Sequence, residues 1–252
     1  MTAAPVISAL NLPAAARVDQ RVPKKLLLES GARTAADKRL INEGIEAIQW
    51  LAALKTATCG VPEFRDDVRE YMEIAVLHLS LREEAKEARL VELLHRAVPY
   101  PVLLLVERGS SSVSVSLAHK RHALKDADKL VLDGEPVTVA MPTADSDIQT
   151  AFLQAMALER QPRATLYALY QGWLDTAVAL QASAQTGVFR MLDSTERAQQ
   201  RHQALHATIA LQGQIATLRG AAAKASQMSR QVELNLQIRK LEAELKQTMG
   251  AL

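Results

Sequence analysis

Four ionisable residues near predicted strand ends have the side-chain types that metal-dependent phosphate chemistry uses: Glu70, Glu73, Glu107 and Lys120. A metal-dependent nuclease needs two or three carboxylates and a lysine that converge, because the bound ion activates water and stabilises the charge of the phosphate. The sequence gives no sign that these four converge, and solvated surface charge is the favoured interpretation. We therefore assign no catalytic residue, metal ion or cofactor. A cryptic or degenerate metal-dependent nuclease is kept as the alternative function.

Other kinds of catalytic site have less support. Nucleophilic catalysis would need Cys59 or a serine beside a histidine, but Ser110–Ser112 form a predicted turn and His78 belongs to a predicted strand core. Neither G-x-G-x-x-G nor G-x-x-x-x-G-K-[ST] occurs, so a nucleotide-binding loop is not indicated. The single cysteine cannot form an internal disulfide. These observations favour a protein that is not an enzyme.

Basic residues gather at two places from which they could contact phosphates. Lys120 and Arg121 follow a predicted hairpin within the segment AHKRHALK, and Lys24 and Lys25 form a second pair. Contacts from lysine and arginine to the phosphate backbone position a protein on nucleic acid without reading its sequence. These four residues are candidate nucleic-acid contacts, with solvated charge as the alternative.

Composition and charge limit the class of protein. The 252 residues are 48% hydrophobic and 23% charged, as in a soluble globular chain. Residues 190–252 contain 9 Lys and Arg against 5 Asp and Glu, whereas residues 1–189 contain 21 against 23. This mild asymmetry argues against a protein that coats DNA but permits local phosphate contacts. Without a signal-peptide pattern or an apolar run of ~20 residues, the sequence predicts a cytoplasmic protein with no membrane contact.

Helical and extended patterns alternate in the middle of the chain. Thr34 and Asp37 have the spacing of a capping box, and apolar residues then recur at intervals of three and four as far as Leu51, which predicts one amphipathic helix. Residues 70–81 are rich in apolar and β-branched types and predict a strand that is covered on both faces. A second helix is predicted over residues 83–98, where acidic residues open the segment.

The next segment predicts a β-hairpin over residues 102–118. In its second strand Val113, Val115 and Leu117 alternate with serines, so the apolar residues should face the core and the serines should face solvent. With the preceding elements this gives a small mixed sheet that has helices packed on one side.

Helical patterns replace the extended ones after residue 145. Leu166, Leu169 and Trp173 recur at intervals of three and four, so they should pack against the α+β domain. Tyr167, Tyr170 and Trp173 cannot all share one stripe, because steps of three residues leave each side chain displaced by ~60° around the helix. One of these tyrosines should therefore be partly exposed and available to a partner.

The C-terminal part has the strongest apolar periodicity, which predicts a coiled-coil-like helix over residues 211–249. Its two stripes are Leu211, Ile215, Leu218, Ala222, Ala225, Ser229, Val232 and Leu236, and, after a phase shift, Leu234, Ile238, Leu241 and Leu245. A narrow stripe needs a second helix to cover it. That helix can come from the same chain, a second copy or a different protein, and Leu218, Val232 and Leu241 are candidate partner contacts.

Three segments together resemble the bacterial family known as domain of unknown function 4391. They are VPKKLLLESGARTAADKRLINEGIEAIQWLAALK, AVPYPVLLLVERGSSSVSVSLAHKR and LYALYQGWLDTAVALQASAQTG. The resemblance runs from about Val22 to the C-terminus. It implies a fold shared with proteins of unassigned activity, whose genes often neighbour helicase, methyltransferase and restriction-type genes. Family members often carry an acidic residue and a lysine on the strand that is EIAVLHLSL here, and this chain lacks that pair, which weakens the nuclease alternative.

These patterns divide an α+β chain into four parts: a flexible segment (1–21), an α+β domain (22–144), a helical region (145–189) and a coiled-coil-like arm (190–252). The expected function is a non-catalytic accessory or assembly subunit of a bacterial DNA-processing or anti-phage defence complex. The expected partners are proteins, such as helicase or methyltransferase subunits of a defence system. Contact with a nucleic-acid backbone and homo-oligomerisation through the C-terminal helix are further expectations.

Overall fold

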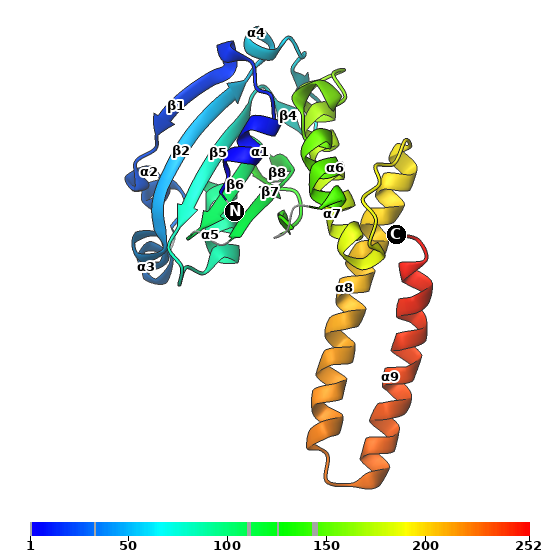
Figure 1. Ribbon diagram of the computed structural model, residues 1–252. Coiled ribbons are helices and arrows are strands. Elements are labelled where there is room, and N and C mark those ends of the chain that lie inside the picture. The colour runs from blue at the N-terminus through cyan, green and yellow to red at the C-terminus, as the bar shows by residue number, and fades with distance from the viewer. Residues whose placement is uncertain (1, 33, 110–111, 125, 143–145) are drawn as a thin grey trace. The chain divides into compact units, whose positions relative to one another are not determined.

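The computed structural model describes residues 2–32, 34–109, 112–124, 126–142 and 146–252 (Figure 1). The chain divides into two compact units, Met1–Ala177 and Val178–Leu252. A mixed sheet with helices makes up the first unit and helices make up the second, which confirms the α+β fold class. The described helices are all too short or too polar to span a bilayer.

A six-stranded sheet forms the centre of the first unit, in the order β1-β2-β5-β6-β7-β10. Its strands are β1 (Arg17–Arg21), β2 (Ile45–Leu54), β5 (Ile74–Leu81), β6 (Val102–Arg108), β7 (Ser112–Leu117) and β10 (Val137–Ala140). β5 and β6 are parallel and the other neighbouring pairs are antiparallel. Parallel strands need a crossover, which helix α5 (Glu87–Ala97) supplies between β5 and β6. β6 and β7 form the predicted antiparallel hairpin.

Smaller elements complete the first unit. Two two-stranded sheets pair β3 (Phe64–Arg65) with β4 (Glu70–Tyr71) and β8 (Lys120–Ala123) with β9 (Asp126–Leu132). The short helical turns are η1 (Ala14–Ala16), α4 (Thr56–Cys59) and η2 (Leu158–Arg160).

Helices cover both faces of the large sheet, so the expectation of helices on one side only is wrong. The first face packs against α2 (Lys24–Ser30), α3 (Ala35–Gly44) and α5 through a common apolar core. On the second face lies α1 (Ala4–Ala9), which Figure 1 shows in front of the strands; α6 (Asp147–Ala155) contacts α1, and the start of α7 (Leu166–Thr186) reaches β6 through the hydrogen bond from the Tyr170 hydroxyl to Val102 O.

The serines of β7 are consequently buried, although their alternation predicts exposure. Ser114 and Ser116 lie beneath α5, where Ser114 Oγ donates to Glu87 (2.6 Å) and Ser116 Oγ is 3.0 Å from His95 Nε2. A polar side chain can be buried at low cost when another side chain satisfies its hydrogen bonds. The polar stripe on β7 therefore marks a polar contact with a helix.

Strand β2 occupies residues for which the sequence predicts a helix. Thr34 does cap α3, because its side chain accepts from Asp37 N (3.1 Å), but the helix ends at Gly44. β2 then pairs with β5, with register shifts between Ile45 and Ala47 and between Trp50 and Ala52. Such bulges break the period of two, and this is why the apolar spacing resembles that of a helix.

Residues 2–21 are folded, which differs from the expected flexible segment. Val6 and Leu10 are fully buried, and β1 pairs with the edge of β2. The apolar residues Val6 and Leu10 at the start of the chain therefore belong to the core of the first unit.

The second unit contains the end of α7, then α8 (Thr195–Lys224) and α9 (Met228–Met249). The last two helices form an antiparallel hairpin: Arg219 pairs with Glu242 (2.7 Å), and Arg201 Nε donates to Leu252 O (3.2 Å). The predicted single helix over 211–249 is thus interrupted between Lys224 and Met228. The same chain supplies the second helix.

Candidate functional site

One face of the sheet changes from apolar to polar toward the ends of β5 and β6. On β5, buried Val76 is followed on the same face by half-buried His78 and Ser80. On β6, buried Leu105 is followed by half-buried Glu107. The two polar ends lie side by side because the strands are parallel and Ser80 is in register with Glu107.

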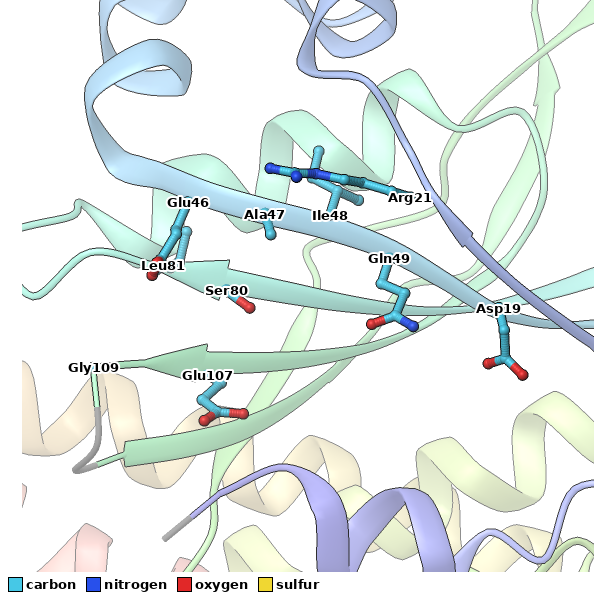
Figure 2. A pocket seen from close by; sticks show the side chains of 10 residues that line it. All are labelled: Asp19, Arg21, Glu46, Ala47, Ile48, Gln49, Ser80, Leu81, Glu107 and Gly109. Carbon is cyan, nitrogen blue, oxygen red and sulfur yellow. The ribbon is translucent and has the colours of Figure 1, made fainter.

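These polar ends form part of a pocket with a volume of about 540 Å³. Its lining residues are Asp19, Arg21, Glu46, Ala47, Ile48, Gln49, Ser80, Leu81, Glu107 and Gly109. Figure 2 shows Asp19, Gln49, Ser80 and Glu107 projecting to one side of the sheet from four adjacent strands, whereas Arg21 lies across β2. The pocket is therefore built by β1, β2, β5 and β6 together.

Glu107 is held in place from two directions. Its Oε2 atom accepts from the backbone N–H of Ala3 (3.0 Å) and lies 3.1 Å from His78 Nε2. A carboxylate can only accept, so the imidazole donates from Nε2 and a neutral ring keeps Nδ1 as an acceptor. The arrangement leaves the second carboxylate oxygen of Glu107, which lines the pocket, to interact with a bound molecule.

Asp19 enters the pocket from an irregular part of β1. Its φ of 50° lies in the left-handed region, and the pairing of β1 with β2 shifts register between Arg17 and Gln20. Bulges of this kind redirect a side chain, and residues in strained conformations concentrate at functional sites. Within the described part of the chain, no hydrogen bond or ion pair engages the side chains of Asp19, Gln49 or Ser80.

The sequence patterns do not predict this pocket. His78 has the pattern of a strand core residue, and no motif marks Asp19, Gln49 or Ser80. The alternation of His78 and Ser80 with leucines was a usable indication of a polar face at the end of β5.

Lys120 is not an exposed phosphate contact, so this prediction is corrected. Only 1% of the residue is exposed, and Nζ donates to Val98 O. Burial lowers the pKa of Lys120 to about 8. Its neighbour Arg121 is half-buried and lies 3.6 Å from Asp133. The hairpin end therefore offers less positive charge to a phosphate than its sequence indicates.

The other basic pair lies on α2, apart from Lys120 and Arg121 on β8. Lys24 Nζ donates to Ile45 O, and burial is the main cause that lowers its pKa. Lys25 is exposed and lies 3.7 Å from Glu29, a pairing that contributes little in water. Phosphate contact by Lys24, Lys25 or Arg121 stays a prediction.

The carboxylates considered for a nuclease do not converge. Glu73 directly precedes β5, whereas Glu107 is in register with Ser80 near the end of that strand, roughly 20 Å away at 3.3 Å per residue. Glu73 is buried and pairs with Lys55 (2.9 Å). Across the described ranges, no group of three or more His, Cys, Asp or Glu residues is placed to hold a metal ion.

A family model matches most of the chain. The family model Domain of unknown function (DUF4391) covers residues 10–245 of the 252. The chain belongs to the DUF4391 family. No curated protein and no solved structure matches it. Membership confirms the resemblance and includes part of the N-terminal segment, but it assigns no activity.

Helix α7 of this DUF4391 protein packs as its spacing predicts, because Leu166, Leu169 and Trp173 are fully buried. Tyr170 is also fully buried, and its hydroxyl donates to Val102 O and accepts from Ala118 N, both at 2.8 Å. Its assignment as a partner contact is therefore corrected.

The second tyrosine of α7, Tyr167, is half-buried. Its ring stacks on Phe64 with centroids 5.0 Å apart, and the Arg69 guanidinium carbon lies 5.6 Å from its centroid. Its role as a partner contact stays a prediction.

Some apolar side chains of the α8–α9 hairpin are buried, and others are exposed to solvent. Leu234 and Ile238 are buried, and Leu218 and Leu241 are half-buried. Val232 is 54% exposed, so its predicted place in a buried seam is wrong. Because the chain turns between α8 and α9, the first apolar stripe does not continue as a buried stripe on α9. The buried positions of α9 are those of the second stripe, Leu234 and Ile238.

Val232 instead belongs to an exposed stripe on α9 with Met228 and Leu236, which are 79% and 61% exposed. At 100° per residue, this stripe lies roughly 140° around the helix from Leu234 and Ile238. We call Met228, Val232 and Leu236 the outer stripe.

Proposed function

We propose that this DUF4391 protein is an assembly subunit of a bacterial DNA-processing or anti-phage defence complex, and that its α8–α9 hairpin binds a partner protein. The outer stripe is the observation that carries the proposal. The neighbourhood of helicase, methyltransferase and restriction-type genes implied by the family resemblance supports this choice of complex.

The outer stripe has the form of a helix-binding surface. Its residues are spaced by four, so they follow one line over about 12 Å of helix at 1.5 Å per residue. Burying an exposed apolar side chain of this size contributes about 1.5–3 kcal/mol. A second amphipathic helix can cover such a line through residues at matching intervals.

Charge at the end of the outer stripe indicates the chemistry of that helix. Arg239 continues the line of the stripe by one turn, and Lys240 follows it, both exposed. The second unit as a whole has more basic than acidic residues. We therefore propose an amphipathic partner helix that carries acidic residues beside its apolar ones, since complementary charge selects the partner and its register.

A co-purification experiment tests the proposal. The tagged full-length chain is co-expressed with the products of the genes adjacent to its own, as wild type and as Val232→Asp/Leu236→Asp. Capture of a neighbouring product should be lost in the double variant, because burying a charge at the contact is costly. Its circular dichroism spectrum and melting temperature should match wild type, because both positions are exposed.

Gln237→Asp is the matched control. It adds one negative charge, where the double variant adds two, at an exposed position on α9 outside the outer stripe, and should leave capture intact. Equal capture by wild type and the double variant would contradict the proposal. So would light scattering that shows a wild-type dimer converted to a monomer by the double variant, since the stripe would then bind a second copy.

A further inference from the structure

We infer that the pocket formed by β1, β2, β5 and β6 binds a cationic ligand rich in hydrogen-bond donors, namely an amine or a guanidinium. The lining residues all belong to the first unit. This binding site is an addition to the proposed assembly role and uses different chemistry from the outer stripe.

The charge of the pocket favours a cation. Three lining residues are carboxylates and one, Arg21, is cationic, and Figure 2 shows Arg21 across β2 from Glu107. Glu46 also lines an adjoining pocket with Arg21 and Lys24, where the cations offset its charge. The negative charge available to a ligand therefore comes mainly from Asp19 and Glu107, which project to the same side of the sheet.

The remaining polar groups select a ligand that donates hydrogen bonds. Asp19 and the free oxygen of Glu107 can only accept. Gln49 and Ser80 can each accept as well as donate. Ammonium and guanidinium groups supply three and five donors and no acceptor, so they match this set.

The site is preorganised. Ala3 N–H and His78 fix Glu107 before any ligand is present, and His78 lies in a rigid strand with β2 and β6 on its two sides. Preorganised groups bind more tightly because less side-chain freedom is lost on binding. Ala47 and Gly109 contribute little side-chain volume to the lining, and about 540 Å³ falls within the usual range for small-ligand sites.

Two sources can supply this chemistry: a free small amine or guanidinium compound, or an arginine or lysine side chain of a bound protein. Calorimetric titration of the full chain separates them. Agmatine and spermidine are the free probes, and acetyl-Gly-Arg-Gly-amide is the peptide probe. Binding of the peptide at least as tight as that of agmatine identifies a protein side chain as the source, whereas binding of the free probes alone identifies a small molecule.

Charge recognition is tested with matched pairs. Replacing arginine by citrulline in the peptide, or the guanidinium of agmatine by a urea, keeps the shape and removes one positive charge: the peptide becomes neutral, and agmatine keeps only its amine. We expect binding weaker by about tenfold or more, the usual consequence of losing a charged hydrogen bond. Asp19→Asn should weaken binding of the cationic probes similarly without unfolding, since Asp19 is exposed.

Glu107→Gln should also weaken binding, with folding checked separately because Glu107 anchors Ala3. Glu63→Gln is the control, since Glu63 is an exposed carboxylate outside the pocket. The double variant of the outer stripe should bind the probes as wild type does, so failure of the two proposals can be told apart.

Three results would overturn the inference: no heat from any cationic probe at millimolar concentration, equal affinity for the two members of each matched pair, or unchanged affinity in Asp19→Asn. Displacement of agmatine by millimolar Mg²⁺ would replace an organic cation with a metal ion and would also reject the proposed ligand class.

Discussion

Lys120 places an ionisable amine in the interior of the first unit. Burial lowers its pKa from 10.5 to about 8, so the unfolded chain binds the proton more tightly than the folded one. Between about pH 8 and pH 10.5 the free energy of unfolding should therefore rise with pH. Below about pH 8 both states are protonated, and this residue makes no pH-dependent contribution.

Urea unfolding between pH 7.5 and 9.5 measures this effect below the range in which tyrosines ionise. We expect the free energy of unfolding of the wild type to rise with pH and that of Lys120→Met to rise less. Lys25→Met is the control, because Lys25 is exposed on α2, and it should keep the wild-type slope. Identical slopes in all three proteins would show that the buried amine is not the cause.

Single residues also explain why the pocket was not predicted. Its polar groups come from four strands, and the order of those strands in the sheet is not a property of any one segment. His78 has the sequence context of a core residue, and only its alignment beside Glu107 gives it a polar partner. Asp19 is directed into the pocket by an irregular backbone that the sequence does not mark.

At the scale of helices, two glycines occupy helix interiors for different reasons. A Cβ on Gly172 of α7 would lie 2.5 Å from Pro162 Cδ, an atom of the rigid proline ring that cannot move aside. A Cβ on Gly213 of α8 would meet no atom within 4 Å. Gly172 therefore permits a close approach of the chain, and Gly213 contributes only backbone freedom.

The same substitution should consequently have opposite effects on stability. Gly172→Ala should lower the free energy of unfolding by about 1–3 kcal/mol, because the added methyl overlaps its surroundings. Gly213→Ala should raise the stability of its helix by about 0.5–1 kcal/mol. Both tryptophans lie in the first unit, so fluorescence follows Gly172→Ala and circular dichroism at 222 nm follows Gly213→Ala. Changes of the same sign would refute this distinction.

The elements that could be predicted are those with local determinants. The Thr34 cap, the doubly covered strand β5, the β6–β7 hairpin and the buried stripe of α7 follow from short patterns. β2 could not be predicted, because its bulges imitate helical spacing. The burial of Ser114 and Ser116 depends on a helix elsewhere in the sequence.

At the scale of the whole molecule, the two units bury their apolar residues to different extents. β5 and β6 are central strands with both faces covered, and residues such as Val76 and Leu104 have no exposed surface. In α9 the buried residues are Leu234 and Ile238 alone. Local opening costs less free energy where fewer apolar contacts are lost, so the α8–α9 hairpin should open before the sheet does.

Native-state hydrogen exchange measured by mass spectrometry tests this order of opening. Peptides from α8 and α9 should exchange their amides well before peptides from β5 and β6, because opening the hairpin exposes little apolar surface. Ile238→Ala, which removes one of the two buried side chains of α9, should speed exchange across both helices and leave β5 and β6 unchanged. Gln237→Ala, at the adjacent exposed position, should change neither.

Two results would mean that the chain unfolds as one cooperative structure. One is a single exchange rate for both units, and the other is faster exchange of β5 and β6 together with the hairpin in Ile238→Ala. The hairpin would then contribute to the stability of the sheet, and its apolar residues could not be substituted for partner binding alone.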